Sequence, residues 1–231
     1  CGGSLVLTKP FDTSLAIDFW NIIKKYKVNT LWFVPSVLSL IMKLDRDKNR
    51  SEYTQKHVSI AFIGMDYVRD NIKSLFEKKY KIPIFENYGL TETLFLTLQN
   101  NKSNISNSGE ILNNVEIRIV DDNYKDVTNG IKGEIIVKTP FLMKEYLDIN
   151  NNDILVDGWF PTGDYGMLND ESDLRIIGRK KDLIIKSGLN ISPSSIENSI
   201  YKLNYIEECG VIGIPDELKG EQIVAVIKIV C

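Results

Sequence analysis

From Ser4 to about Leu96, short apolar runs alternate with segments of helical periodicity, and this alternation limits the possible folds more than any other feature. Strand–helix alternation argues for a parallel sheet with helices packed on its faces. The expected order is a strand at 4–8, a helix capped by Thr13 or Ser14, a strand at 30–34, a helix at 37–44, a strand at 59–63, a helix at 71–79 and a strand at 83–85. The sequence therefore predicts part of a parallel α/β sheet subdomain over residues 1–105.

Helical periodicity largely disappears after Asn100–Ser108, a stretch rich in Asn and Ser that is typical of a loop. The runs that follow are short, apolar and separated by Asp, Asn and Gly turns, as in small β-rich folds. They predict strands at 115–120, 133–138, 159–160, 165–168 and 173–177. A β-rich subdomain is therefore expected over residues 106–180.

The pattern changes again beyond Lys181, where helix and strand signals are mixed. Ser192-Pro193 is typical of a helix start, since proline is tolerated in the first turn, and that helix should end near Lys202. Strands are expected at 183–185, 209–214 and 222–230. We expect residues 181–231 to form the start of a truncated α+β domain.

Composition excludes some classes of function. A net charge of −3 argues against nucleic acid as the main partner, because phosphate binding needs concentrated Lys and Arg. The cysteines Cys1, Cys209 and Cys231 have no metal-like spacing, which favours a reducing cytoplasm. No apolar run is long enough for a transmembrane segment, and Cys1-Gly2-Gly3 does not begin a signal peptide.

The two ends of the chain lie against apolar, strand-like runs, Ser4–Leu7 and Ile227–Cys231. Natural termini are more often polar and poorly ordered. We therefore expect this chain to be a piece of a longer protein.

The most informative motif is Glu86–Thr93, in which Tyr88-Gly89-Leu90-Thr91-Glu92 follows a predicted strand. Gly89 would let the backbone approach a nucleotide closely, and the Thr91 hydroxyl could donate to a phosphate oxygen. Glu92 offers the oxygen ligand that Mg²⁺ prefers. The alternative is a plain strand-to-helix turn with Thr91 as the cap and Glu92 in the first helical turn.

Two later motifs add a carboxylate and a guanidinium, in Thr162-Gly163-Asp164 and in Gly178–Asp182. The oxygens of Asp164 match the paired hydroxyls of a ribose, although an Asx-type turn would also explain the residue. Arg179 could bind the same sugar, or could belong to a solvated basic turn.

In this order, the three motifs resemble the signature of the adenylate-forming enzymes, which include acyl-CoA synthetases, luciferases and peptide-synthetase adenylation domains. The resemblance extends from about Gly3 to Val230. It implies that Tyr88, Gly89 and their neighbours hold adenine, Thr91 the α-phosphate, Glu92 magnesium, and Asp164 with Arg179 the ribose. It also implies that Lys181 is the hinge of the C-terminal domain and that the Gly188-Leu189-Asn190 loop lines the thiol tunnel.

The resemblance implies an ATP-dependent acid–thiol ligase that uses Mg²⁺, activates a small carboxylic acid as acyl-AMP and transfers the acyl group to coenzyme A. Tyr-Gly-Leu-Thr-Glu looks more like the acyl-CoA ligases, since peptide-synthetase domains more often have Pro before the Thr. A carrier protein with its phosphopantetheine thiol is the alternative acceptor. A non-catalytic nucleotide-binding module of the same fold is the alternative function.

Three departures from the family pattern qualify that expectation. Nothing in Cys1–Asn87 matches the family's Ser/Thr/Gly-rich phosphate loop, and the C-terminal catalytic lysine would lie beyond Cys231. The chain by itself is therefore expected to lack adenylation activity. Where the family has a Gly-x-Ala-Pro-like turn, this chain has Gly64-Met65-Asp66-Tyr67, which changes side chains expected to flank adenine and the acyl pocket.

The remaining candidates are better explained without a role in the site. His57 is the only histidine and lies in a polar stretch, so a surface position is expected. Four apolar residues could line an acyl pocket, but their periodicity fits core packing better. They are Trp32, Phe33, Met42 and Phe62.

Overall fold

The computed structural model describes residues 2–65, 68, 70–100, 108–147, 154–203 and 205–230. Several sequence predictions lie outside these ranges: the boundary between residues 105 and 106, Asp66 and Tyr67, and the terminal Cys1 and Cys231. The chain divides into two compact units, Cys1–Asn87 and Tyr88–Cys231, and each has its own hydrophobic core. The division into 1–105, 106–180 and 181–231 stays a prediction.

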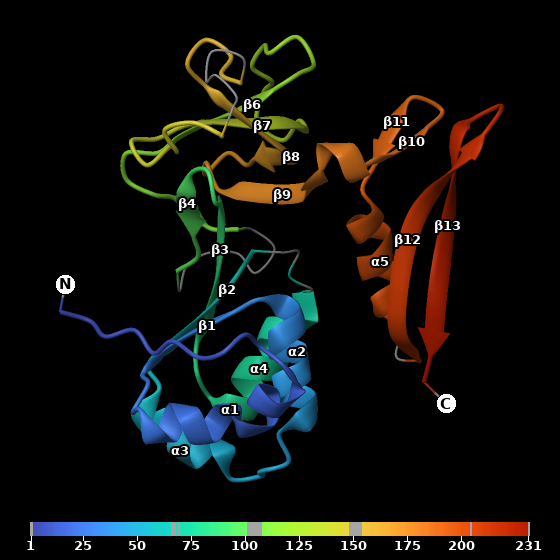
Figure 1. Ribbon diagram of the computed structural model, residues 1–231. Coiled ribbons are helices and arrows are strands. Elements are labelled where there is room, and N and C mark those ends of the chain that lie inside the picture. The colour runs from blue at the N-terminus through green and yellow to red at the C-terminus, as the bar shows by residue number, and fades with distance from the viewer. Residues whose placement is uncertain are drawn as a thin grey trace. The chain divides into compact units, whose positions relative to one another are not determined.

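The first unit is built on parallel strands joined by helices, which confirms the predicted α/β class (Figure 1). Phe33 lies opposite Ile63 in the first pair of strands, and Ile63 lies opposite Glu86 in the second. The helices connect successive parallel strands, as such a sheet requires. In chain order the elements are α1 (Thr13–Lys25), β1 (Thr30–Phe33), α2 (Pro35–Leu44), α3 (Arg50–His57), β2 (Ile60–Ile63), α4 (Asp70–Tyr80) and β3 (Ile84–Leu90).

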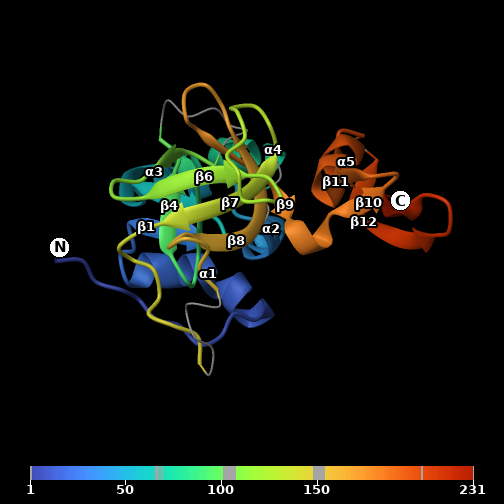
Figure 2. The same cartoon turned by 90° about the horizontal axis from the view of Figure 1, so that it is seen from above.

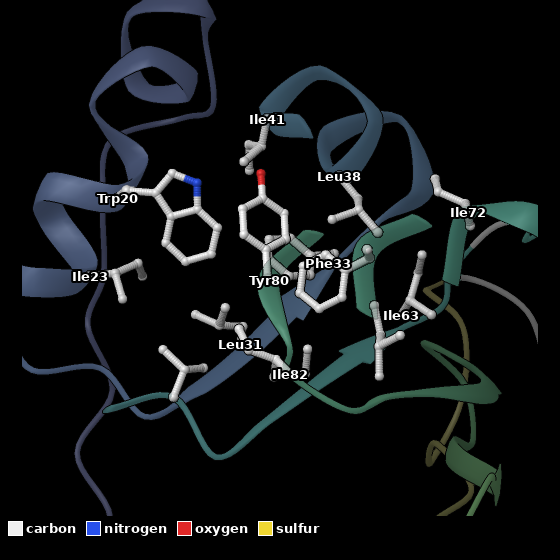
Figure 3. Close-up of a cluster of buried hydrophobic side chains, with 14 of the residues drawn as sticks. Trp20, Ile23, Leu31, Phe33, Leu38, Ile41, Ile63, Ile72, Tyr80 and Ile82 are labelled. Carbon is white, nitrogen blue, oxygen red and sulfur yellow. The ribbon is translucent and has the colours of Figure 1, made fainter. Parts of the chain in front are cut away.

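One face of β1 and β2 and the inner faces of the helices form the first core (Figure 3). Alternate strand residues, such as Leu31 and Phe33, are buried because successive side chains of a strand point to opposite faces. The rings of Trp20 from α1 and Tyr80 from α4 lie 4.7 Å apart between centroids. This close packing fixes the start of β3, the strand that leads into the Tyr88 motif.

The prediction that the four apolar candidates are core residues is confirmed for two of them. Phe33 is only 2% exposed, and Met42 packs against the same core. The prediction is wrong for Trp32, which is 49% exposed because it follows Leu31 on the opposite face of β1. Its ring lies 6.5 Å from that of Phe62, a partly buried residue of β2.

Two local predictions about the first unit are wrong, and one helix was missed. Ser4–Thr8 is not a strand; Leu5 and Leu7 are each 83% exposed. The cap of α1 is Asp12, whose carboxylate accepts a hydrogen bond from the Leu15 amide at 2.7 Å. The helix α3 was not predicted, because its sequence is polar and lacks an apolar stripe. His57 is exposed at the end of α3, as predicted.

The second unit begins as antiparallel strands, which confirms the predicted β-rich character. Its main sheet has the order β6-β7-β8-β9, and Figure 2 shows β6, β7 and β8 side by side. Leu96, Ile135 and Leu174 are fully buried in its core. The strands are β4 (Leu94–Leu98), β5 (Glu110–Ile111), β6 (Glu116–Val120), β7 (Gly133–Lys138), β8 (Phe160–Leu168) and β9 (Leu174–Arg179).

The strand β8 contains a bulge where two separate strands were predicted. Ile136 pairs with Pro161 and Glu134 pairs with Tyr165, so Thr162–Asp164 stand opposite the single residue Ile135. Gly163 has a φ of +70°, in the region that favours glycine, and the Thr162 hydroxyl donates to the Ile135 carbonyl at 2.8 Å. Bulges of this kind redirect a side chain without ending the strand.

The last part of the second unit is a small antiparallel sheet with one helix, α5, packed on β12 (Figure 1). Its strand order is β11-β10-β13-β12. The elements are β10 (Ile184–Lys186), β11 (Leu189–Ile191), α5 (Pro193–Tyr201), β12 (Ile206–Asp216) and β13 (Gly220–Ile229). No helix in the described ranges is long and apolar enough to cross a membrane.

The predicted loop Gly188-Leu189-Asn190 is only partly a loop. Leu189 and Asn190 belong to β11, which pairs with β10 in a tight hairpin. Ser187 and Gly188 form its turn, with φ values of 51° and 80°. Two consecutive residues with positive φ are typical of two-residue hairpin turns, because that geometry matches the twist of the strands.

Candidate nucleotide-binding site

The Thr91-Glu92-Thr93 turn joins β3 to β4 and is closed by its own hydrogen bonds. The Thr93 amide donates to the Leu90 carbonyl at 3.2 Å, and the Leu90 amide donates to the Thr93 hydroxyl at 3.3 Å. Leu94, the first residue of β4, has a φ of +56°. Thr91 is exposed and Glu92 is partly buried at this turn. The alternative interpretation, a strand-to-helix turn, is wrong because a strand follows.

Asp164 lies at the end of the β8 bulge and is only 4% exposed. Its Oδ2 accepts a hydrogen bond from the Tyr88 hydroxyl at 2.7 Å, and its Oδ1 lies 3.0 Å from Arg179 Nε. Arg179 is the residue paired with Asp164 across β8 and β9. Tyr88, Asp164 and Arg179, which were predicted to contact the nucleoside, therefore form one cluster.

Burial determines how the groups of this cluster titrate. Burial raises the pKa of the Asp164 carboxyl, and the nearby charges of Asp182 and Glu134 add to that rise. The hydrogen bond from Tyr88 and the charge of Arg179 act in the opposite direction. Burial, followed by the charge of Asp164, raises the pKa of Tyr88 well above its usual value. Tyr88 is therefore a donor at neutral pH.

The raised pKa of Asp164 leads us to expect that the free energy of unfolding depends on pH. The folded protein binds the Asp164 proton more tightly than the unfolded chain, whose Asp pKa is about 3.9. The contribution of Asp164 to stability should be fully present below that pKa and should be lost as the pH rises through the folded value. We expect the free energy of unfolding of wild type, relative to Asp164→Asn, to fall as the pH rises from about 4 to 7.

Chemical denaturation of both proteins at several pH values measures this difference. Asn keeps the shape of the side chain but does not titrate in this range, so the common pH dependence of the other groups cancels. A difference that stays constant or grows with pH would contradict the raised pKa.

A second pair of contacts, which sequence reasoning missed, surrounds Glu92. The Tyr146 hydroxyl donates to Glu92 Oε1 at 2.7 Å, and the Met143 amide donates to the Glu92 carbonyl at 2.6 Å. Burial, with the Glu92 hydrogen bond and charge, raises the pKa of Tyr146 to about 12. Tyr146 and Met143 are both far from Glu92 in sequence, so these contacts could be found only from the three-dimensional structure.

The predicted hinge residue Lys181 is exposed in a short 3-10 turn, Lys180–Asp182. Its neighbour Lys180 forms an ion pair with Glu134 at 2.7 Å. In the part of the chain that the structure describes, Lys181 and Gly188 take no part in the hydrogen bonds and ion pair of Asp164.

The residues present fit a magnesium ion that arrives with a nucleotide. Within the described ranges no group of three or more His, Cys, Asp or Glu residues could hold a metal by itself. Mg²⁺ usually takes one or two carboxylates and completes its shell with phosphate oxygens and water. Glu92, which uses Oε1 in its bond with Tyr146, supplies a carboxylate of that kind.

Comparison with known families identifies the chain over most of its length. The family model described as AMP-binding enzyme matches residues 1–147. The model described as AMP-binding enzyme C-terminal domain matches residues 195–230. The first match alone covers more than half of the chain and includes the Thr91-Glu92 turn and Tyr146.

Curated relatives include a long-chain-fatty-acid–CoA ligase of Salmonella typhimurium, 29% identical over 227 residues, which are 96% of this chain and 39% of the relative. The indoleacetate–CoA ligase of Aromatoleum aromaticum is 30% identical over 232 residues, which are 98% of this chain and 44% of the relative. The chain thus spans about two fifths of the length of the curated relatives it matches.

Solved structures give the same result. ATP-bound MatB from Rhodopseudomonas palustris matches with a TM-score of 0.83 and 27% identity, over 97% of this chain and 44% of that one. The o-succinylbenzoate CoA synthetase of Bacillus subtilis, in complex with its acyl-adenylate intermediate, matches with a TM-score of 0.81 and 26% identity, over 97% and 46%. These matches confirm the resemblance read from the motifs, and the chain belongs to the AMP-binding enzyme family.

Proposed function

We propose that this chain contributes the nucleoside-binding part of an ATP-dependent acid–thiol ligase. In the first step a carboxylate oxygen of the acid attacks the α-phosphorus of ATP, and the bond to pyrophosphate breaks. In the second step a thiol sulfur attacks the acyl carbon, and the bond to AMP breaks. The buried Asp164, flanked by Tyr88 and Arg179, is the observation that carries this proposal.

Each residue of the cluster has a role in the proposal. Asp164 would accept hydrogen bonds from the two ribose hydroxyls, and Arg179 would donate to the same sugar. The Tyr88 ring and the Gly89 backbone would lie against adenine. Thr91 would donate its hydroxyl to the α-phosphate.

Glu92 would hold Mg²⁺, which neutralises phosphate charge when it is bound. Because this cation needs few protein ligands, the turn that carries the exposed Thr91 and the partly buried Glu92 suits a metal–phosphate complex better than a free ion.

The chemistry needs no general base. A carboxylic acid with a pKa of about 4 is already ionised at neutral pH, so it can attack phosphorus if charge and alignment are provided. This agrees with the exposed position of His57, the only histidine, on α3. Positioning and electrostatic stabilisation supply most of the catalysis in phosphoryl-transfer chemistry.

The second step would use the C-terminal part of the chain. We propose that this part turns about Lys181 and that the Gly188 hairpin turn then lines the path of the thiol. Lys180, held by Glu134, would keep the preceding residues in place during the turn.

Coenzyme A is the proposed thiol, because the named relatives are CoA ligases. A carrier-protein phosphopantetheine is the alternative acceptor. Fatty and aryl acids are the candidate substrates, after the long-chain-fatty-acid and indoleacetate ligases among the relatives. A cytoplasmic location is proposed from the spacing of the three cysteines in the sequence.

Acid-dependent exchange of pyrophosphate into ATP tests the first step in the protein at its natural length. A panel of fatty and aryl acids should include at least one that supports exchange, and coenzyme A should then release AMP. The 231-residue chain alone should give no exchange, because Cys1–Asn87 contains no Gly-rich phosphate loop. Exchange by the 231-residue chain above background would contradict that expectation.

A non-catalytic nucleotide-binding module is the alternative function. It would bind AMP through Asp164 but would support no exchange with any acid. The same assay therefore separates the two proposals, provided that AMP binding is measured alongside it.

A further inference from the structure

The segment after β7 holds Glu92 at two points. Met143 donates its amide to the Glu92 carbonyl at 2.6 Å, and Tyr146 donates its hydroxyl to Glu92 Oε1 at 2.7 Å. The start of this segment is itself folded, since the Thr139 hydroxyl accepts from the Phe141 amide at 3.2 Å. One contact fixes the backbone of the turn and the other fixes the end of the side chain.

The Glu92 carboxylate differs from Glu134 and Asp164 in the kind of group that it contacts. The buried Glu134 is paired with Lys180, and Asp164 is paired with Arg179, so each of these carboxylates already faces a cation. In the part of the chain that the structure describes, the Glu92 carboxylate accepts its hydrogen bond from a neutral hydroxyl, that of Tyr146. A neutral donor orients the carboxylate but leaves its negative charge available to a cation.

A fixed orientation matters because a glutamate side chain loses rotamer freedom when it is immobilised, and this loss has a free-energy cost. If Tyr146 restricts Glu92 before a ligand arrives, that cost is not subtracted from the binding of the ligand. Hydrogen-bonding partners behind metal ligands commonly act in this way.

We propose that Tyr146 is a positioning residue, whose hydroxyl orients the Glu92 carboxylate toward the magnesium ion of a bound MgATP. The inference rests on the proposed function, because it requires that Glu92 meet a cation carried by the nucleotide. Tyr146 touches neither the nucleotide nor the ion and acts only through Glu92.

Nucleotide binding with and without magnesium tests this role without measuring turnover. ATP affinity is measured by titration calorimetry, in Mg²⁺ and in excess EDTA, in the protein at its natural length. Tyr146→Phe, which removes one oxygen atom, should lower the Mg²⁺-dependent gain in ATP affinity about tenfold. Its affinity for AMP without Mg²⁺ should stay within about twofold of wild type, because the ribose cluster is not involved.

Tyr124→Phe is the matched control, since Tyr124 is an exposed tyrosine in the same unit. It should leave both affinities unchanged. Combining Tyr146→Phe with Glu92→Gln separates positioning from a general structural role. If Tyr146 acts through Glu92, the two changes together should cost no more than Glu92→Gln alone.

Three other results would contradict the positioning role of Tyr146, and a fourth would contradict the proposed function. A Tyr146→Phe protein with the full Mg²⁺-dependent gain would overturn the positioning role and leave the proposed function intact. A Tyr146→Phe effect that persists in the Glu92→Gln background, or that equally weakens AMP binding, would also overturn it. A wild-type protein that binds neither ATP nor AMP would reject the proposed function itself.

Discussion

Replacing Asp164 with Asn is expected to weaken AMP binding about 100-fold or more in the protein at its natural length. In the proposed complex the carboxylate accepts two hydrogen bonds from the ribose, and each charge-assisted bond contributes about 1.5–3 kcal/mol. Asn keeps one acceptor and turns a donor toward either the sugar or Tyr88. Losing both charge-assisted bonds would cost at least about 3 kcal/mol, which is roughly 100-fold.

Fluorescence or calorimetric titration with AMP measures this effect directly. Asp126→Asn is the matched control, because Asp126 also forms an ion pair with an arginine, Arg118 at 2.6 Å, but lies exposed on the surface. The control should bind AMP like wild type. Equal AMP affinities for wild type and Asp164→Asn would show that the ribose assignment is wrong.

Replacing Gly89 with Ala is expected to destabilise the protein by about 3 kcal/mol or more and to remove nucleotide binding. A β-carbon at residue 89 would lie 2.0 Å from the Leu94 carbonyl oxygen and 2.9 Å from the Phe95 α-carbon. Both are backbone atoms of β4, so no side-chain movement can relieve the overlap. The hairpin would have to open, which would displace Thr91 and Glu92.

Thermal unfolding and AMP titration of the same sample test both parts of this prediction. Gly210→Ala in β12 is the control, since a β-carbon there has no heavy atom within 4 Å. It should unfold at the wild-type temperature or slightly above it. An unchanged unfolding temperature for Gly89→Ala would mean that β3 and β4 do not approach as closely as described.

The order of elements could be predicted from the sequence because buried positions are apolar and recur at a regular spacing. The spacing is two residues in a strand and three to four residues in a helix. In β1 and β2 alternate residues enter the core, and in α1 the buried Leu15, Trp20 and Ile23 follow helical spacing. The Tyr88, Asp164 and Arg179 motifs could be predicted as one site only through the family resemblance. Asp164 meets Arg179 through the pairing of β8 with β9, and it meets Tyr88 of β3 across 76 residues of sequence, a contact that no local pattern specifies.

The errors arose where local signals were ambiguous or lacking. An apolar run such as Ser4–Thr8 is compatible with a strand, but a strand also needs a partner, and sequence does not reveal one. Asp12, Thr13 and Ser14 are all good helix caps, so the choice among them depends on backbone angles. Tyr146 carries no motif of its own, and its contact with Glu92 joins residues that are distant in sequence.

The bulge in β8 sets the position of Asp164 without changing the register of the core residues on either side of it. Because the three residues Thr162–Asp164 stand opposite one residue of β7, β8 has two more residues than its partner at this point, which is an even number. An even insertion preserves the inside–outside parity of the strand, so Phe160 and Tyr165 keep the faces that the register assigns to them. Substitutions at Thr162–Asp164 can therefore change the polar groups presented at the bulge while the hydrophobic residues on either side of it stay in register.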